Sequence, residues 1–173
     1  MIKSKEGIPI VNRKELNLIL DRIEESNSKK GVVLLGKPGT GKTTIMNERV
    51  KYGISSNQLA TKYMLKGIEG FVNQQGNLML PTCSIDDLGT EILPSHYGNK
   101  LDLIPYLLQL NYEQSRDFRF YTSNLNYEEL RERYGARVID RLHETCYFFI
   151  LEDVPFRELA TAEKINQELN EEA

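Results

Sequence analysis

Tryptophan is absent from this 173-residue chain, and cysteine and histidine occur only twice each. Cys83 and Cys146 lie in apolar runs, with no C-x-x-C pair and no cluster of cysteines and histidines around them. This favours two buried, reduced thiols over a disulfide or a zinc site. His96 and His143 lie far apart in the sequence and lack the spacing of metal ligands, so we interpret both as structural or surface residues.

Long apolar runs and an excess of positive charge are also missing. No stretch is apolar for long enough to span a bilayer, and the N-terminus lacks the apolar segment of a signal peptide. We therefore expect a cytoplasmic protein that has no membrane partner. The net charge is −3 and the sequence pI is about 5.5. Because a strong non-specific affinity for nucleic acid normally comes from a basic surface, any DNA binding must use a local patch or several copies of the protein.

What the chain does contain is the pattern of one α/β domain. Its length, its 40% hydrophobic content and its 27% charged content suit a single globular domain with a real core. Apolar runs predict buried strands at 31–35, 78–86, 118–122 and 146–151. Helices are predicted at 13–25, 41–51, over most of 54–75, from 99 or 102 to 114, and at 126–144 with an interruption near 135, whereas residues 1–11 should be irregular. This alternation predicts a parallel sheet flanked by helices on both faces.

Residues 36–43, Gly-Lys-Pro-Gly-Thr-Gly-Lys-Thr, match the motif G-x-x-x-x-G-K-[ST] in full, between a predicted strand and a predicted helix. Such a loop turns its backbone N–H groups towards phosphates, and the helix that follows directs its positive end at the same anion. Lys42 can reach the β- and γ-phosphates of ATP, and the Thr43 hydroxyl can ligate Mg²⁺. The full motif in this context disfavours a chance glycine-rich turn. The predicted nucleotide contacts are Gly36, Pro38, Gly39, Thr40, Gly41, Lys42, Thr43 and Thr44.

A loop of this kind works with an acid at the end of a neighbouring strand, which helps to hold Mg²⁺. Asp86 and Asp87 stand at the end of a predicted strand and are the candidates. Asp86 would hold the metal, directly or through water, and Asp87 would orient or deprotonate the attacking water. The alternative is that both acids only end a strand and open a turn at Gly89.

The run Ile85-Asp86-Asp87-Leu88-Gly89-Thr90-Glu91 resembles the Walker B segment of one family of AAA+ ATPases, the DnaC/DnaI-type helicase loaders and the related IstB-type transposition helpers. Three later stretches resemble further motifs of this family, in the same order along the chain. They are Tyr97-Gly98-Asn99-Lys100 before a long apolar helix, Thr122-Ser123-Asn124-Leu125 as a sensor 1 strand end, and residues 134–142 (YGARVIDRL) as an arginine-finger box. The resemblance covers roughly residues 30–157, and it implies a P-loop NTPase fold with an AAA+ core.

The resemblance implies roles for four residues beyond the phosphate loop. Asn124 would contact the γ-phosphate or the lytic water as a sensor, although it also suits a cap for the next helix. Arg137 and Arg141 share a helix face at spacing i, i+4, and in this family such arginines reach the ATP of the next subunit. A solvated, salt-bridged face is the alternative for this pair. Arg157 matches a sensor 2 arginine.

The implied function is that of the ATPase of a bacterial replicative helicase loader, which uses ATP and Mg²⁺ and turns over slowly. The implied partners are further copies of the chain, single-stranded DNA and a replicative helicase. Two alternatives stay open: a transposition helper that assembles on duplex DNA, and a nucleotide-gated regulator with little turnover. A small-molecule kinase is disfavoured because no arginine-rich lid segment follows the acid pair.

The expected organisation is a single AAA+ ATPase domain over residues 1–173. Residues 1–30 would form a short helical extension, and residues 158–173 a polar, acidic tail. The helical lid of AAA+ ATPases is expected to be reduced or absent, because little sequence follows residue 151.

Overall fold

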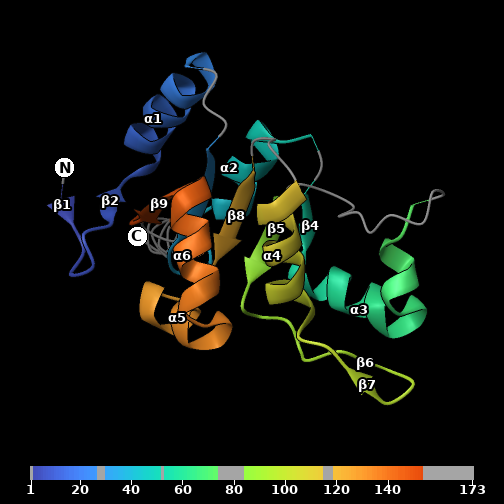
Figure 1. Cartoon of the computed structure of the whole chain (residues 1–173). Coiled ribbons are helices and arrows are strands. Elements are labelled where there is room, and N and C mark those ends of the chain that lie inside the picture. Colours follow the sequence, from blue (N-terminus) through green and yellow to red (C-terminus); the bar gives the residue numbers. More distant parts are fainter. Residues whose placement is uncertain (1, 27–29, 52, 74–83, 115–118, 154–173) are drawn as a thin grey trace, which may run out of the picture.

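The computed structural model describes residues 2–26, 30–51, 53–73, 84–114 and 119–153, which form one main sheet between layers of helices (Figure 1). The main sheet has the strand order β1-β2-β9-β3-β8-β5-β4, and β6 and β7 form a separate hairpin. The strands are β1 (Ile2–Lys3), β2 (Pro9–Val11), β3 (Gly31–Leu35), β4 (Gly53–Ser55), β5 (Ser84–Leu88), β6 (Ser95–His96), β7 (Asn99–Lys100), β8 (Phe120–Ser123) and β9 (Cys146–Leu151). The helices are α1 (Arg13–Glu25), α2 (Lys42–Arg49), α3 (Ser56–Lys66), α4 (Leu103–Gln114), α5 (Tyr127–Tyr134) and α6 (Ala136–Thr145), with a 3₁₀ helix, η1 (Ile68–Phe71), after α3.

The strand pairs of the main sheet are parallel except for β1 with β2. The central strand, β3, places Leu35 opposite Ser123 of β8 and opposite Ile150 of β9. Parallel neighbours end at the same edge of a sheet, so the loops after β3, β5, β8 and β9 meet there. We call this the carboxyl edge. The opposite edge, where Gly31 pairs with Cys146, is the amino edge.

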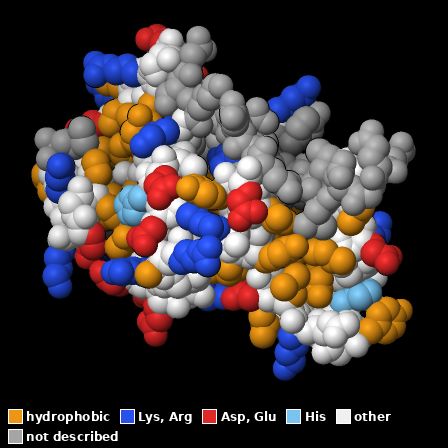
Figure 2. All heavy atoms as spheres, viewed as in Figure 1, with side chains coloured by type: hydrophobic (Ala, Val, Ile, Leu, Met, Phe, Trp, Pro, Cys, Tyr) orange, Lys and Arg blue, Asp and Glu red, His pale blue; other side chains and the backbone are white. Residues whose placement is uncertain are grey.

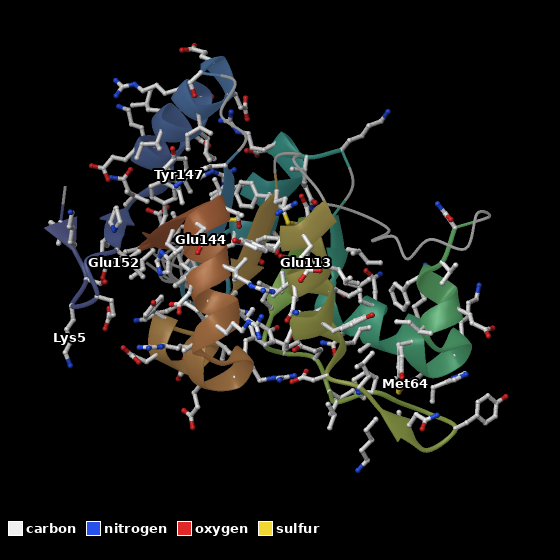
Figure 3. All side chains as sticks on the ribbon, viewed as in Figure 1. Lys5, Met64, Glu113, Glu144, Tyr147 and Glu152 are labelled. Carbon is white, nitrogen blue, oxygen red and sulfur yellow. The ribbon has the colours of Figure 1, made fainter. Side chains whose placement is uncertain are left out.

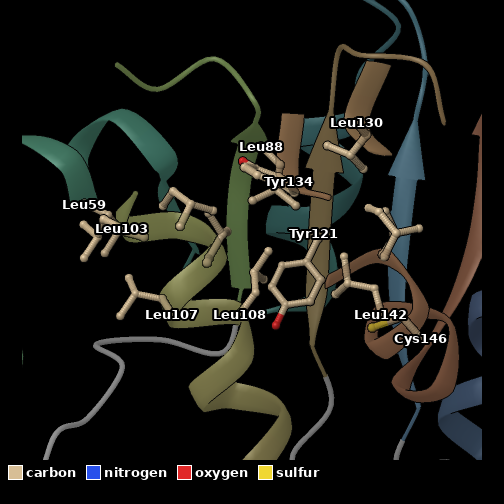
Figure 4. Close-up of a cluster of buried hydrophobic side chains, with 14 of the residues drawn as sticks. Leu59, Leu88, Leu103, Leu107, Leu108, Tyr121, Leu130, Tyr134, Leu142 and Cys146 are labelled. Carbon is tan, nitrogen blue, oxygen red and sulfur yellow. The ribbon is translucent and has the colours of Figure 1, made fainter. Parts of the chain in front are cut away.

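Both faces of the central strand are buried, as its continuous apolar sequence predicts. Val32 and Leu34 belong to one apolar cluster, and Val33 and Leu35 belong to another. Helices α1 and α2 complete the first cluster, and α3, α4, α5 and α6 complete the second, part of which Figure 4 shows. Successive residues of a strand face opposite sides, so this strand needs helices on both faces to keep all its side chains from water.

Local signals predict several elements correctly. Helix α1 fills the predicted range 13–25 and begins with the expected capping box. The Asn12 side chain accepts the Glu15 N–H at 2.9 Å, and the Glu15 carboxylate accepts the Asn12 N–H at 3.1 Å. The predicted helix at 126–144 is divided at Gly135 into α5 and α6. The strands predicted at 31–35 and 146–151 have the predicted bounds.

The predictions for short strands are wrong. Residues 1–11 are not irregular, because they contain β1 and β2, and β2 extends the sheet beside β9. The range 54–75 is mostly helical, as predicted, through α3 and η1, but it begins in β4 and its α-helix ends at Lys66. Strand β5 continues to Leu88, two residues beyond its predicted end. Strands of two or three residues show no period in the sequence, since distant pairing partners decide where they form.

Some expectations concern residues outside the described ranges. These are the strand residues 78–83 with Cys83, the sensor 2 candidate Arg157, and the acidic tail and lid region after residue 153. Within the described ranges, no helix is both long enough and apolar enough to cross a membrane. Cys146 is a free, buried thiol, as predicted.

Candidate nucleotide-binding site

The phosphate-loop motif forms the connection from β3 to α2, at the carboxyl edge of the sheet. Gly39 and Gly41 have φ angles of 84° and 90°, a left-handed region that other residues adopt only at a cost. Gly41 is the N-cap of α2, so the loop leads directly into the first turn of that helix. The backbone therefore needs glycine where the motif has it, and the N-terminus of α2 faces the loop.

Three other predicted contacts of the loop differ in exposure. Pro38 and Thr44 are exposed, whereas Thr40 is buried and its hydroxyl donates to the Lys37 carbonyl oxygen at 2.9 Å. The Thr40 side chain therefore holds the loop in its turn.

Lys42, the first residue of α2, is buried, with 4% of its surface exposed. Its ammonium group donates to the carbonyl oxygens of Gly36 and Lys37, both at 2.8 Å, and to Asn124 Oδ1 at 2.7 Å. Burial lowers the pKa of Lys42, and the charges of Asp87 and Asp86 in β5 oppose this effect. An ammonium group has three donors, and here neutral oxygens accept all of them. A phosphate in the loop would be a stronger acceptor for the same buried charge.

Thr43 and Asp86, the two residues predicted to hold Mg²⁺, lie next to each other. The Thr43 hydroxyl donates to both carboxylate oxygens of Asp86, at 2.9 and 3.1 Å, and the Thr122 hydroxyl donates to Asp86 Oδ1. The part of the chain that the structure describes holds no cluster of three or more His, Cys, Asp or Glu side chains that could bind a metal alone. A cation at Thr43 and Asp86 would need further ligands from phosphates and water, which is the usual preference of Mg²⁺.

Asn124 joins Lys42 to Asp87. Its Oδ1 accepts from Lys42, and its Nδ2 donates to Asp87 Oδ1 at 3.0 Å. Asn124 is not the cap of the next helix, because Asn126 has that role and accepts the Glu129 N–H at 3.0 Å. Burial, and after it the charge of Asp86, raises the pKa of Asp87, and Lys42 and Asn124 partly oppose this rise. A carboxylate with a raised pKa is a better proton acceptor near neutral pH.

A bulge in β5 explains how two successive acids reach the same site. In a regular strand Asp86 and Asp87 would face opposite sides of the sheet. The pairing of β5 with β8 shifts register between Ile85 and Leu88, and Asp87 has a left-handed φ of 56°. Ile85 and Leu88 consequently pack into the same apolar cluster although they are three residues apart. The bulge turns Asp87 towards the phosphate loop, and the acid pair alone did not predict this distortion.

A cavity of about 650 Å³ adjoins the loop beside the end of β9. Glu152, which Figure 3 labels, belongs to its lining. Its apolar lining includes Ile10 of β2, Leu125 and Ile150. The polar residues around it include Asn126, Glu129, Glu152 and Asp153. This volume suits a small organic ligand, for which pockets of roughly 300–1,000 Å³ are usual. The cavity is not predicted from the sequence, because β2, which helps to line it, is not predicted either.

The structure does not bring Arg137 or Arg141 to this site. Arg137 is exposed near the start of α6. The guanidinium carbon of Arg141 lies 4.8 Å from the ring centre of Tyr112, and its Nη1 is 3.7 Å from Glu113, both on α4 (Figure 3). Helix α6 continues into β9 at the amino edge, so Arg141 lies about one turn from the edge opposite to the phosphate loop. Arg157, the predicted sensor 2 arginine, lies outside the described residues.

Comparison with known proteins supports the fold. No family model matches the sequence, and no curated protein matches it. Among solved structures, the chain is similar to the crystal structure of the DnaC helicase loader, with a TM-score of 0.56 and 21% sequence identity over 86% of this chain and 95% of that chain. At this level of identity the similarity concerns the fold. It confirms the predicted class, an α/β fold in which a mostly parallel sheet lies between helices.

Proposed function

We propose that this chain is an ATP-binding and ATP-hydrolysing AAA+ protein of the helicase-loader type, and that it acts in the cytoplasm as a single ATPase domain. The main support is the connected set of Lys42, Asn124, Asp87, Thr43 and Asp86. Two strand ends and one helix start bring together a cation, an amide, a hydroxyl and two carboxylates at the phosphate loop. A P-loop nucleotidase needs these groups in this arrangement.

Nucleotide binding would change the partners of Lys42. The ammonium group would leave carbonyl oxygens of its own loop for the β- and γ-phosphates, a gain because charge-assisted hydrogen bonds are stronger than those to neutral acceptors. The N-terminus of α2 would add its positive end. The neighbouring cavity, with Ile10 and Ile150 in its lining, would accept the apolar faces of the base.

Hydrolysis would use the residues on the other side of Lys42. Asp87 would accept a proton from a water that attacks the γ-phosphorus, while the bond from this phosphorus to the β-phosphate oxygen breaks. Asn124, which holds Asp87 at 3.0 Å, would orient the same water. Thr43 and Asp86 would hold Mg²⁺, which neutralises charge on the β- and γ-phosphates.

A second copy of the chain would complete the site. Arg141 lies near the amino edge and therefore cannot easily reach the phosphate loop of its own chain. We propose that Arg141, with Arg137 beside it on the same helix, contacts the nucleotide of a neighbouring copy. Turnover of separate monomers would then be slow, and Arg157 would add a sensor 2 contact.

We propose single-stranded DNA and a replicative helicase as further partners, because the structurally similar protein is a helicase loader. The candidate DNA contact is the α3–hairpin surface, a groove of about 570 Å³ lined by Lys62, Leu65, Lys66, Glu69, Gly70, His96 and Tyr97. Figure 2 shows hydrophobic side chains gathered around a histidine over this part of the molecule.

Tyr97 is the most exposed large hydrophobic side chain of the described residues, at 94%, and it lies in the turn between β6 and β7. Its backbone has a φ of 48°, which is unusual for an aromatic residue and belongs to the two-residue turn that it forms with Gly98. His96 supports it, with the two ring centres 4.5 Å apart, and His96 Nδ1 lies 2.9 Å from the carbonyl oxygen of Met64 on α3 (Figure 3). An exposed ring beside Lys62 and Lys66 provides stacking and charge for a single strand.

The test is steady-state ATP turnover of the full chain, measured alone, with single-stranded DNA and with duplex DNA. We expect Mg²⁺-dependent turnover that single-stranded DNA stimulates more than duplex. Stronger stimulation by duplex would favour the transposition helper. Tight ATP binding without turnover under any condition would favour the nucleotide-gated regulator, and absence of ATP binding would overturn the proposal.

A further inference from the structure

A cluster of polar side chains, Glu91, Arg133, Tyr134 and Asp102, lies next to the aspartate pair. The Glu91 side chain is 1% exposed, and a buried carboxylate is costly unless other groups pair with it. Arg133 donates to Glu91 Oε1 at 2.8 Å, and the Tyr134 hydroxyl donates to the two carboxylate oxygens at 3.0 and 3.1 Å. Arg133 also forms a bidentate pair with Asp102, at 2.8 and 3.0 Å. Well-packed apolar side chains could fill such a volume with equal stability, so stability alone does not explain the cluster.

The cluster contacts the turn that carries Asp87. The Gly89 N–H donates to the Tyr134 hydroxyl at 2.7 Å and to Glu91 Oε2 at 2.9 Å. Figure 4 shows the Tyr134 hydroxyl beside Leu88, at the end of β5. Burial, and after it the charge of Glu91, raises the pKa of Tyr134, so the hydroxyl keeps the proton that it donates to Glu91. The second amide after Asp87 is thus fixed by two acceptors that are themselves bonded to each other.

Asp87 needs such support because its conformation is strained. Its φ of 56° belongs to the left-handed region, which is unfavourable for a residue other than glycine. The Asp87 carbonyl oxygen accepts from the hydroxyls of Ser56 and Thr90, at 2.7 and 2.8 Å. Those two bonds fix one side of the turn, and the bonds at Gly89 fix the other. Without the latter, rotation towards a regular strand would turn the Asp87 carboxylate away from the phosphate loop.

We propose that Tyr134 and Glu91 are positioning residues, which direct the Asp87 carboxylate at the attacking water by fixing the Gly89 N–H. This inference rests on the proposed role of Asp87 as the base. Neither side chain lines the cavity proposed for the base. Their loss should therefore lower the rate of hydrolysis and leave nucleotide affinity unchanged.

The test begins with Tyr134→Phe, which removes only the hydroxyl. Its matched control is Tyr127→Phe on the same helix, whose hydroxyl lies 3.1 Å from His143 Nε2 and not near the turn. We expect Tyr134→Phe to lower kcat about tenfold or more, since small misplacement of a reacting group can cost about 10²-fold. Affinity for ATP·Mg²⁺ should stay within about twofold of the parent, because a base contributes little to ground-state binding. Tyr127→Phe should behave like the parent.

A double-mutant cycle separates positioning from general weakening of the fold. If Tyr134 acts through Asp87, adding Tyr134→Phe to Asp87→Asn should lower kcat no further, because the group to be positioned is gone. The inference would be overturned by an equal loss of kcat with Asp87 intact and with Asp87→Asn. It would also be overturned if Tyr134→Phe lowered kcat in neither case. Both results would leave the ATPase proposal intact. Full activity of Asp87→Asn alone would instead reject Asp87 as the base, and the inference with it.

A second pair of variants keeps the test decisive if Tyr134→Phe does not fold. Glu91→Gln retains an oxygen that can accept the Gly89 N–H, whereas Glu91→Met has similar size and no such acceptor. We expect Glu91→Gln to keep a higher kcat than Glu91→Met, with equal ATP affinity in both. Equal kcat values in the two folded variants would count against a role through this amide.

Discussion

The carboxyl edge and the amino edge of the sheet hold the two parts of the proposed ATPase site, and one chain assembles only the first. At the carboxyl edge, hydrogen bonds of 2.7–3.1 Å connect Lys42, Asn124 and Asp87, and join Thr43 to Asp86. Near the amino edge, Arg141 lies on the ring of Tyr112, remote from that network. Groups that hold a ligand can be organised within one fold. Arg141 has only 19% of its side chain exposed there, so it would have to leave Tyr112 to act on the ligand of a neighbour.

The largest expected effect is at the carboxyl edge. Replacing Lys42 with Ala removes the one cation of the network and the charge-assisted contact with phosphate, so most affinity for ATP·Mg²⁺ should be lost. Titration calorimetry of the folded variant measures this. Lys14→Ala, which removes an exposed lysine of α1, is the control and should bind like the parent. Unchanged affinity of Lys42→Ala would contradict the whole assignment of the site.

Asp87→Asn should bind ATP nearly normally and lower kcat by roughly 10²–10⁴-fold, the usual contribution of a general base. Asp86→Asn is the comparison, and it should weaken binding mainly when Mg²⁺ is present. Single-turnover rates and binding titrations separate the two effects. If Asp87→Asn hydrolyses ATP as fast as the parent, the base is another group.

The raised pKa of Asp87 predicts two effects of pH, one on the activity of the parent and one on the stability of Asp87→Asn. Because burial raises this pKa above its ordinary value of 3.8, kcat/KM of the parent, which reports the free enzyme, should fall on the acid side at a higher pH than an ordinary aspartate would give. Ionised Asp87 also destabilises the fold, since the unfolded chain loses the proton more readily. Asp87→Asn should therefore raise Tm slightly at neutral pH, and this gain should disappear as the pH falls below the raised pKa.

The contrast between contiguous and dispersed features explains what the sequence could predict. The phosphate loop is one run of residues, so its motif predicts both the turn and the side chains that Lys42 and Thr43 present. The strands at 31–35 and 146–151 are also predicted, because each is a complete apolar run. Strand β2, with Ile10, is too short for such a signal, and the cavity that it lines was missed with it.

Pairings across long sequence distances could not be predicted. Asp86 and Asp87 were expected to act together, yet the bulge that turns both towards the loop depends on the pairing of β5 with β8. Glu91 and Tyr134 both fall within stretches that resemble known motifs, but nothing in either stretch indicates that they bond to each other. They are 43 residues apart, and the packing of α5 against the sheet brings them together.

Replacing Arg141, near the amino edge, should lower kcat by a smaller factor, and only where copies of the chain assemble. Arg141→Ala should bind ATP normally and lower kcat by about 10²–10³-fold, the loss expected for one stabiliser of transition-state charge. For the parent, the rate per protomer should rise with protein concentration, because the arginine comes from a second copy. The exposed Arg131→Ala on α5 is a control for charge.

Mixing variants tests the two-edge arrangement directly. Arg141→Ala and Asp87→Asn are each expected to be slow alone, but a mixed pair can place an intact site against an intact Arg141. Some activity should therefore return on mixing. A rate per protomer that is independent of concentration, with Arg141→Ala fully active, would leave Arg141 as a half-buried residue that packs on Tyr112.

The smallest effect is expected away from both edges, on the α3–hairpin surface. With a net charge of −3, single copies should bind a DNA strand weakly, and an ATP analogue that promotes assembly should be needed for measurable affinity. Tyr97→Ala should then weaken binding about tenfold through lost stacking, without changing the dependence on salt. Lys62→Ala and Lys66→Ala should each reduce the slope of log affinity against log salt by about 0.7, the value for one phosphate of a single strand. Lys5→Ala, which replaces an exposed lysine far from this surface, is the control (Figure 3).

Fluorescence anisotropy with a labelled single strand, in ATP analogue, ADP and no nucleotide, measures all four variants. If Tyr97→Ala and Lys5→Ala behave alike, the strand binds elsewhere. In that case the exposed tyrosine is better explained as a contact for a protein partner, which a loss of helicase binding in Tyr97→Ala would reveal.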